Sequence, residues 1–357
     1  MPATAELHDL GQSLWLDNIT RRMLDEGQIQ RYVDEYSVSG LTSNPSIYDH
    51  AIGTGAYDDA IADKAGAGVT GEDLFFELAV EDLRRAADLF LAQHERSDGL
   101  DGWVSLEVSP KLAYDASSTV AEASALHGRA GRPNLFIKIP GTPEGLPAIE
   151  ETIAAGVPVN VTLLFSAEQY VAAAEAYMRG IERRLADGSD PAVGSVASVF
   201  MSRWDVAVKD AVPEELRDRL GLAVGADAYR AYRRLLDSPR WQRLEGLGAR
   251  PQRLLFASTS TKDPQASDTL YVTGLAAPLT VNTMPDATLE AFHDHGRLEG
   301  VLSADGGGCD EVLAAFGEAG VDVGALAAKL QADGAAAFVS SWDDLISRMT
   351  AQSEAVA

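Results

Sequence analysis

The chain has 357 residues, of which 46% are hydrophobic and 23% are charged, a balance typical of soluble globular proteins. It contains 54 acidic and 29 basic residues, and the resulting formal net charge of -25 repels nucleic-acid phosphates and anionic membrane surfaces. We therefore expect neither nucleic acid nor a membrane as a partner. A small phosphorylated substrate remains compatible with this charge if a few cations gather around it.

The N-terminus and the single cysteine indicate a cytoplasmic protein. Residues 1–15 contain neither the basic nor the apolar segment of a secretory signal, and no apolar run reaches the roughly 18 residues of a membrane span. Cys309 has no second cysteine with which to form an intramolecular disulfide. We interpret it as an inert small residue in a reducing compartment.

Short β-rich runs alternate with amphipathic helical patterns along the whole chain. The expected strands lie within residues 13–19, 38–44, 103–109, 135–140, 157–165, 193–200, 253–259 and 278–285. Helical patterns cover residues 73–94, 145–156, 167–188 and 226–238. Alternation of this kind predicts a parallel sheet, which is compatible with an open doubly wound sheet or a closed barrel. Eight strands, and no G-x-G-x-x-G motif after the first one, favour a (β/α)8 TIM barrel.

No linker or internal repeat divides the chain, so residues 1–357 are predicted to form one barrel domain. We expect residues 300–357 to form additional C-terminal helices packed on the outside. Several helix starts follow a strand directly. Asn44 and Thr142 each precede a proline that suits the first helical position, and Ser166 with Gln169 matches a capping box. These junctions mark the carboxyl ends of strands, where barrel enzymes build their sites.

Polar side chains share the inward parity of six expected strands. Alternate residues of a barrel strand face the interior, so Asn160 and Thr162 point inward while Val159, Val161 and Leu163 face the helices. The inward pairs are Trp15 with Asp17, Thr42 with Asn44, Ser105 with Glu107, Phe136 with Lys138, Asn160 with Thr162, and Ser198 with Phe200. One interpretation is a buried hydrogen-bond network, and the other is a functional site. Their convergence at strand carboxyl ends favours the site.

Lys138 is the only lysine inside an apolar strand. Removal of a lysine from water lowers its pKa and yields the neutral amine that attacks a ketone to form a Schiff base. The alternative is a structural lysine paired with Glu107 or Asp17, and the two interpretations are compatible.

The sequence gives no support for metal or serine-nucleophile chemistry. His293 and His295 are two residues apart in a helical pattern and so point to different faces. The remaining histidines have no clustered carboxylate or cysteine partners, and the G-x-S-x-G motif of a nucleophile elbow does not occur. We therefore expect no metal.

Nine segments of the chain match a known family. They are WLDNI, SGLTSNPSIY, VSLEV, LFIKIPGT, VNVTLLFS, SVASVFMSR, LLFASTSTKDP, DTLYV and LTVNTMP. Together they resemble the transaldolases of the longer bacterial type, from about residue 10 to about residue 350. The resemblance implies a (β/α)8 barrel, a class I Schiff-base mechanism without metal or organic cofactor, and a role in the non-oxidative pentose phosphate pathway.

The resemblance also implies a role for each matching catalytic position. Lys138 corresponds to the Schiff-base lysine, and Asp17 to the acid/base that removes the C4 hydroxyl proton. Glu107 and Thr162 correspond to the residues that hold a proton-shuttling water. A pair of amides, Asn44 and Asn160, corresponds to the groups that bind the dihydroxyacetone hydroxyls, with Thr42 beside them on the inward face.

Phosphate binding is implied for a second group of positions. Arg203 and Ser258 resemble the family's phosphate-binding residues, and Ser198 lines the same end. The sequence departs from the family pattern at Ser260, where we expect a glycine. An added side chain in a tight loop alters its geometry or supplies a hydroxyl donor. We predict Lys262 as the second cation.

Phe200 bears on the type of reaction. Related fructose 6-phosphate aldolases have a tyrosine at this position, and phenylalanine carries no proton that would release the enamine. We therefore predict transfer of dihydroxyacetone from sedoheptulose 7-phosphate to glyceraldehyde 3-phosphate, although a packing role for Phe200 remains open. The alternatives are a related enzyme with a different aldehyde acceptor and a non-catalytic barrel that binds sugar phosphates.

Overall fold

A closed barrel of eight parallel strands forms the centre of the computed structural model, which describes residues 1–356, with the backbone alone for 355 and 356. The strands follow one another around the barrel in chain order, and the last pairs with the first. They are β1 Ser13–Leu16, β2 Val38–Leu41, β3 Trp103–Glu107, β4 Leu135–Pro140, β5 Val159–Leu164, β6 Ser195–Phe200, β7 Gln252–Ala257 and β8 Val281–Met284. Seven lie within a predicted run, and β7 begins one residue before its run, so the predicted (β/α)8 barrel is confirmed.

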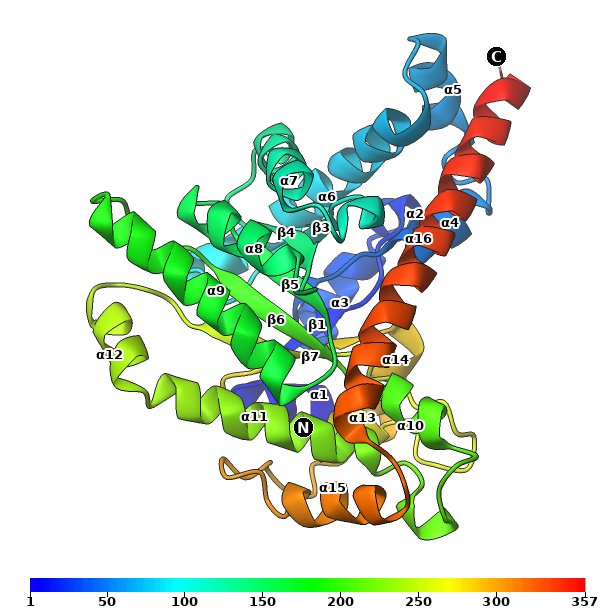
Figure 1. Ribbon diagram of the computed structural model, residues 1–357. Helices are drawn as coiled ribbons and strands as arrows, with labels where there is room; N and C mark the ends of the chain where they lie inside the picture. Colours follow the sequence, from blue (N-terminus) through cyan, green and yellow to red (C-terminus); the bar gives the residue numbers. More distant parts are fainter. Residues whose placement is uncertain (357) are drawn as a thin grey trace.

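Helices surround the barrel and connect its strands (Figure 1). The first half has α1 Ala3–Asp9, α2 Arg21–Asp25, α3 Gln28–Tyr36, α4 Pro45–Ile52, α5 Asp58–Gly66, α6 Gly71–Arg96, η1 Pro110–Leu112, α7 Ala116–Ala130 and α8 Gly145–Ala154. The second half has α9 Ala167–Ala186, α10 Ser202–Val208, η2 Glu214–Leu216, α11 Leu220–Leu236, α12 Pro239–Gly246, α13 Leu270–Gly274, α14 Asp286–His295, α15 Cys309–Glu318 and α16 Val323–Val356. No described helix is both long and apolar enough to cross a membrane.

The predicted helix starts at Asn44 and Ser166 are correct, and the one at Thr142 needs revision. Asn44 caps α4 as expected, and its side chain accepts a hydrogen bond from the backbone N–H of Ile47. Thr142 does not cap a helix that begins at Pro143. Its hydroxyl accepts from the N–H of Gly145 and closes a turn, so α8 begins only at Gly145. Ser166 caps α9, because its hydroxyl accepts from the N–H of Gln169, but the capping box is incomplete, since the Gln169 side chain accepts from the N–H of Phe165 instead of that of Ser166.

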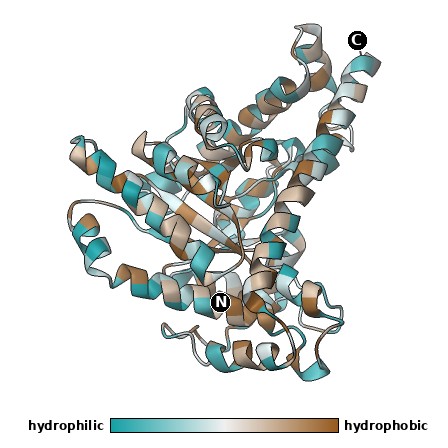
Figure 2. Cartoon of the chain, in the orientation of Figure 1, coloured by the Kyte–Doolittle hydropathy of each residue, from teal (hydrophilic) through white to brown (hydrophobic). Residues whose placement is uncertain are grey.

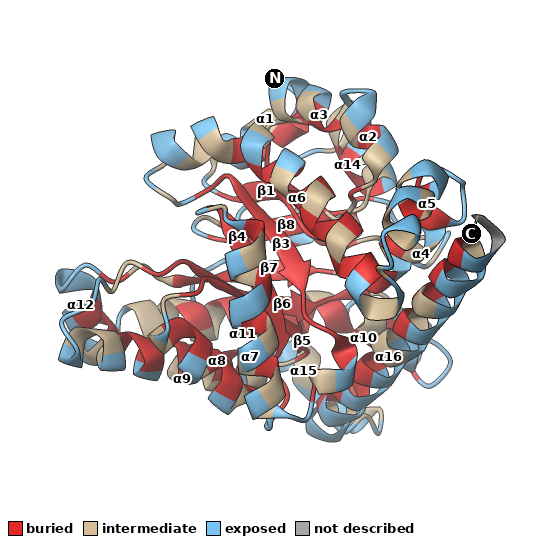
Figure 3. Cartoon of the chain, turned by 90° about the horizontal axis from the view of Figure 1, so that it is seen from above, coloured by how far each residue is buried: buried red, intermediate tan, exposed pale blue. Residues whose placement is uncertain are grey.

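Apolar side chains fill two layers, one between the strands and the helices and one inside the barrel. Figure 2 shows hydrophobic residues on the strands and inward helix faces, and Figure 3 shows the strands buried beneath exposed outer turns. Ile137, Ile139 and Val159 belong to the layer against the helices, as their parity predicts. Within the barrel, the rings of Trp103 and Phe136 stack with centroids 4.0 Å apart. The barrel is therefore a packed core and not an open pore.

The predicted parity of Leu163 is wrong. The register between β5 and β6 shifts between Val161 and Leu164, and Leu163 adopts a left-handed backbone conformation with φ of 60°. A bulge of this kind interrupts the alternation of a strand and redirects the following side chain. Leu163 consequently packs with Phe165 and Phe200 of the inner apolar group instead of with the helix layer.

The C-terminal segment contains two helices with different positions. The first, α15, packs against α11 of the outer ring, whereas α16 extends across the carboxyl ends of the strands toward α4 and α5 (Figure 1). The side-chain amide of Gln331 on α16 donates to the carbonyl oxygens of Gly141 and Leu163, at 3.0 and 2.9 Å. These bonds join α16 to the ends of β4 and β5, so the helix forms one wall of the barrel opening.

Candidate active site

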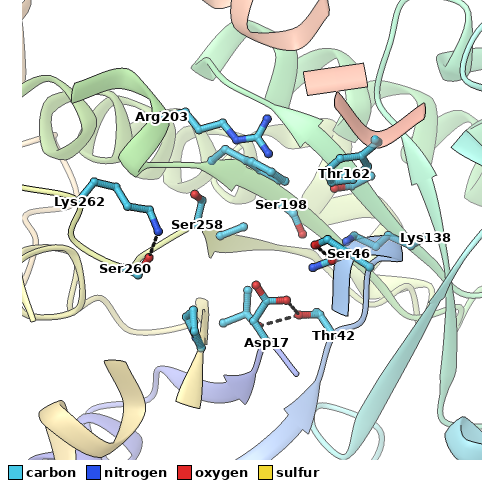
Figure 4. A pocket seen from close by; sticks show the side chains of 16 residues that line it. Asp17, Thr42, Ser46, Lys138, Thr162, Ser198, Arg203, Ser258, Ser260 and Lys262 are labelled. Carbon is cyan, nitrogen blue, oxygen red and sulfur yellow. Dashed lines mark hydrogen bonds between the residues drawn. The ribbon is translucent and has the colours of Figure 1, made fainter. Parts of the chain in front are cut away.

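A cavity of about 290 Å³ opens at the carboxyl ends of the strands (Figure 4). Its lining residues are Asp17, Thr42, Asn44, Ser46, Lys138, Thr162, Ser198, Phe200, Arg203, Ala257, Ser258, Ser260, Lys262, Thr283, Pro285 and Phe338. All eight strands or their immediate carboxyl-terminal extensions contribute polar side chains to this wall or to the layer directly below it. The cavity therefore lies on the face where a parallel barrel collects residues that are distant in the sequence.

Lys138 is 5% exposed, and its side chain ends inside the barrel. Its ammonium nitrogen lies 3.4 Å from a carboxylate oxygen of Glu107 and donates a hydrogen bond of 3.2 Å to the carbonyl oxygen of Ser43. Glu107 and Asn160 are the direct register neighbours of Lys138 on β3 and β5. The predicted pairing of the lysine with Glu107 is thus present, and the amine also reaches the cavity.

Asp17 follows β1 and faces the cavity beside Thr42 (Figure 4). The Thr42 hydroxyl donates to an Asp17 carboxylate oxygen at 2.8 Å and lies 2.9 Å from the Thr283 hydroxyl. Burial raises the pKa of Asp17 above its ordinary value, and the charge of Lys138 and the Thr42 hydrogen bond offset only part of this effect. The result is a carboxylate that accepts a proton more readily than one in water.

Glu107 lies below the cavity wall and is only 5% exposed. Burial raises the pKa of its carboxyl, and the neighbouring Lys138 opposes that rise. Among the described side chains, both Glu107 carboxylate oxygens and the Thr162 hydroxyl are buried without a hydrogen-bond partner. Buried polar groups normally have partners. These groups are therefore suited to bind a polar species that enters from the cavity.

The two predicted amides occupy different environments. Asn160 is fully buried below the cavity, where it donates to the Ser105 hydroxyl at 3.1 Å and accepts from the Ser198 hydroxyl at 2.8 Å. Asn44 lines the cavity, but its side-chain oxygen caps α4 and accepts a second hydrogen bond from Ser46. The Asn44 amide nitrogen is the part of this side chain that remains for a ligand.

Two cations and a serine lie at the other end of the cavity (Figure 4). Burial lowers the pKa of the half-buried Arg203. The Lys262 ammonium donates to the hydroxyl of Ser260, the residue that departs from the expected glycine. Ser258 has a left-handed backbone with φ of 55°, and its hydroxyl is 2.8 Å from that of Ser202. Strained non-glycine residues of this kind cluster at ligand-binding sites.

The cavity brings together most of the predicted site residues, which come from segments far apart in the chain. Ten of the twelve line it, and the other two, Glu107 and Asn160, lie in the layer below and contact Lys138 or Ser198. Sequence reasoning missed Phe338, whose ring lies 5.8 Å from the Lys138 nitrogen. Phenylalanine in an amphipathic C-terminal helix carries no signal that separates a cavity wall from ordinary packing.

Sequence reasoning also missed Thr283 and Ser46. Thr283 stands at the inward parity of the eighth predicted strand, so the rule that found Thr42 would have found it. Ser46 lies in the first turn of α4, where serine is common for reasons of helix capping alone. In the described part of the chain, no group of three or more histidine, cysteine, aspartate or glutamate side chains is arranged to hold a metal ion.

The fold and the site together define a (β/α)8 barrel with a buried lysine between carboxylates at its carboxyl end, the arrangement of the class I aldolase superfamily. The family model described as Transaldolase/Fructose-6-phosphate aldolase matches residues 14–349. The chain belongs to the transaldolase/fructose-6-phosphate aldolase family.

Proteins named transaldolase are similar to this chain over nearly its whole length. The protein from Parafrankia sp. strain EAN1pec is 44% identical over 358 residues, covering 98% of this chain and 97% of the relative. That from Thermobifida fusca is 44% identical over 359 residues, covering 97% of each. The Kocuria rhizophila protein is 43% identical over 362 residues, covering 99% of this chain and 98% of the relative.

Proposed function

We propose that this protein is a transaldolase that moves a dihydroxyacetone unit from sedoheptulose 7-phosphate to glyceraldehyde 3-phosphate through a Schiff base on Lys138. The observation that carries the proposal is the position of this amine, which is buried beside Glu107 and still lines a cavity with Arg203 and Lys262. A ketose phosphate needs an amine for its carbonyl and cations for its phosphate. We also place the reaction in the cytoplasm, where the buried free thiol of Cys309 remains reduced.

Lys138 begins the reaction by attack on the C2 carbonyl of the donor. The ammonium first transfers a proton to Glu107, whose raised pKa makes that carboxylate a better acceptor than one in water. The neutral amine adds to the carbonyl to give a carbinolamine, and loss of water forms the protonated imine. Thr162 and Glu107 hold the water through which protons move in this step, because their buried side-chain oxygens have no hydrogen-bond partner among the described side chains.

Asp17 carries out the carbon–carbon bond cleavage as a general base. Its carboxylate removes the proton of the C4 hydroxyl, the C3–C4 bond breaks, and its electron pair moves into the imine to form an enamine. The aldehyde product leaves while dihydroxyacetone stays bound to Lys138. Addition of the enamine to the acceptor aldehyde reverses these steps, and Asp17 returns the proton to the new C4 hydroxyl. Hydrolysis of the imine then releases the product and restores the amine.

Amides and cations hold the two ends of the substrate. Asn44 and Asn160 bind hydroxyls of the dihydroxyacetone unit, with Thr42 keeping the carboxylate of Asp17 in place. Arg203 and Lys262 bind the phosphate at the opposite end. Among the side chains described for residues 1–354, Arg203 has neither an ion pair nor a hydrogen-bond partner, so a half-buried charge there favours an anionic ligand. Ser258 and Ser198 complete this end of the cavity.

Borohydride trapping tests the Schiff base directly. Incubation with fructose 6-phosphate and sodium borohydride is expected to add the mass of a reduced dihydroxyacetone or hexose unit to the peptide that contains Lys138. The same treatment of Lys138→Arg, which keeps the charge but is not nucleophilic at neutral pH, gives no adduct. Absence of an adduct on the wild-type chain would exclude the enzymatic function and leave a barrel that only binds sugar phosphates.

A different acceptor is the second candidate function, and Ser260 is the observation that favours it. The Ser260 hydroxyl accepts a hydrogen bond from the Lys262 ammonium, which a glycine at this position could not do. The cationic end of the cavity therefore differs from that of a chain with glycine here. Initial rates with fructose 6-phosphate as donor, compared between erythrose 4-phosphate and other aldehydes, distinguish the two candidates. A preference for another aldehyde would assign the chain to that reaction.

A further inference from the structure

Two aromatic rings enclose the Arg203 guanidinium. Its central carbon lies 5.2 Å from the centroid of the Phe200 ring and 5.9 Å from that of Phe338. Phe200 ends β6, whereas Phe338 comes from α16, more than a hundred residues later in the chain. Both distances are within the range in which the face of an aromatic ring attracts a cation. The arginine is therefore held by ring faces in place of a protein carboxylate.

Gly334 lies one helical turn before Phe338 and also borders Arg203. A Cβ atom at this position would be 3.1 Å from the Arg203 Nη1 atom and 3.1 Å from the Leu163 Cδ2 atom. Contacts that short require the neighbours to move. Glycine inside a helix lowers stability relative to alanine, so the residue is unfavourable for α16 itself. The absence of a side chain at Gly334 leaves the space that the Arg203 guanidinium occupies.

The part of α16 that bears these residues is fixed on both sides. Before Gly334, Gln331 donates to two backbone carbonyls at the ends of β4 and β5. After Phe338, the Trp342 indole donates to Glu72 at 2.9 Å, and Asp343 pairs with Lys111 at 2.8 Å. The ring and the glycine are thus parts of a rigid wall, which sets where the arginine can point.

We propose that Phe338 and Gly334 are positioning residues that orient Arg203 and make α16 the element that determines preference for phosphorylated aldehydes. The inference rests on the proposed function, in which Arg203 binds the phosphate. Phe338 supplies the ring face and Gly334 the space, so that the guanidinium is oriented before the substrate arrives. Preorganisation of this kind increases affinity by reducing the ordering that binding requires.

Acceptor kinetics test the proposal, with glyceraldehyde 3-phosphate compared with D-glyceraldehyde at saturating fructose 6-phosphate. Phe338→Leu is expected to raise KM for the phosphorylated acceptor by about threefold to tenfold, the range of one cation–π contact, and to change KM for D-glyceraldehyde little. Phe338→Tyr keeps the ring face and restores the wild-type ratio of the two KM values.

Gly334→Ala provides a second and independent variant, because it contacts Arg203 and not Lys138. It is expected to raise KM for glyceraldehyde 3-phosphate while the resistance of the protein to urea stays equal or increases, since alanine favours the helix. A loss of structure would instead raise KM for glyceraldehyde 3-phosphate and lower the resistance to urea. Gly324→Ala, in the first turn of the same helix and with only an ordinary contact of 3.6 Å between its Cβ and Asp322 Oδ1, is the matched control and leaves KM unchanged.

Phe316→Leu controls for the loss of a buried ring in the C-terminal helices. Phe316 lies on α15 and does not line the cavity, so this variant reduces stability without altering the ratio of the two KM values. The positioning role is wrong if Phe338→Leu and Gly334→Ala raise KM for glyceraldehyde 3-phosphate and KM for D-glyceraldehyde by the same factor. It is also wrong if these variants change neither KM value. Borohydride trapping in the same variants distinguishes that result from a failure of the proposed function. An adduct on Lys138 means that the Schiff base still forms, whereas its absence in the wild-type protein as well would exclude the proposed function.

Discussion

Burial of Asp17 connects its chemistry to the stability of the fold. Its raised pKa means that the folded protein binds a proton at this carboxyl more tightly than the unfolded chain does. As the pH rises from the ordinary carboxyl value through the raised one, the unfolded state loses the proton first. The stability contributed by this group therefore falls with rising pH across that window, and the loss is complete above it.

Asp17→Asn is accordingly expected to abolish transfer and to increase the free energy of unfolding at neutral pH. Asparagine still accepts the Thr42 hydrogen bond but carries no charge to desolvate. The stability gain should shrink as the pH is lowered toward the ordinary carboxyl range. Urea unfolding at a series of pH values measures it. Asp63→Asn, at an exposed position, serves as the control with little change at any pH. A wild-type protein more stable than Asp17→Asn at neutral pH contradicts the expected sign.

Phe200 is expected to suppress hydrolytic release of the enamine. Its ring lines the cavity and bears no acidic proton. Phe200→Tyr places a phenol there, and we expect release of free dihydroxyacetone from fructose 6-phosphate without an acceptor to increase by about tenfold or more. Phe200→Leu removes the ring without adding a proton and so tests for the effect of lost packing. Equal release by both variants would mean that packing, and not proton donation, controls the outcome.

Individual site residues were predictable where a strand parity rule applied to them. Lys138, Asn160 and Thr162 stand out because a polar side chain repeats at the inward position of an apolar strand. Leu163 shows the limit of the rule, since it lies at a bulge whose carbonyl accepts a hydrogen bond from the distant Gln331, and strand parity does not encode such a bulge. Phe338 shows another limit, because a ring beside a cation has the same sequence signature as one in a core.

Among the elements, the strands followed from the sequence more closely than the helix boundaries. All eight runs overlap a strand because apolar, β-branched residues between turn signals leave few alternatives. The start of α8 was misplaced because Thr142 and Pro143 form a turn whose hydrogen bonds resemble those of a helix cap. The course of α16 across the barrel opening depends on contacts with α4 and the ends of β4 and β5, which local pattern does not encode.

Gln331 is expected to hold α16 on the barrel. Gln331→Leu leaves two buried carbonyl oxygens without their donor, which costs about 1–3 kcal/mol of unfolding free energy. KM for fructose 6-phosphate should rise as well, because the cavity wall is loosened. Urea unfolding and steady-state kinetics measure the two effects. Gln242→Leu removes a similar side-chain bond to a backbone carbonyl at an exposed position and should change stability by less than about 0.5 kcal/mol. Equal losses in the two variants would contradict this role of Gln331.

For the molecule as a whole, the two ends of the barrel have different tasks. The carboxyl end holds the cavity, whose carboxyl groups have pKa values raised by burial. The amino end is closed by Arg253, which donates to the Ser13 hydroxyl at 2.6 Å and to the Thr280 carbonyl at 2.8 Å. The guanidinium also lies 3.5 Å from Asp101. These contacts connect β7 with β1, the start of β8 and the loop before β3, which favours a structural role for this end.

Replacement of Arg253 therefore separates stability from chemistry. Arg253→Met leaves Asp101 buried without its cation, and removal of one partner from a buried pair costs about 3–5 kcal/mol. We expect that loss in urea unfolding, together with wild-type kcat and KM at temperatures where the variant is folded, because Arg253 does not line the cavity. Asp101→Asn in the same chain should recover part of the stability, since it removes the unpaired charge. An altered KM in the fully folded variant would show instead that the amino end helps to shape the cavity.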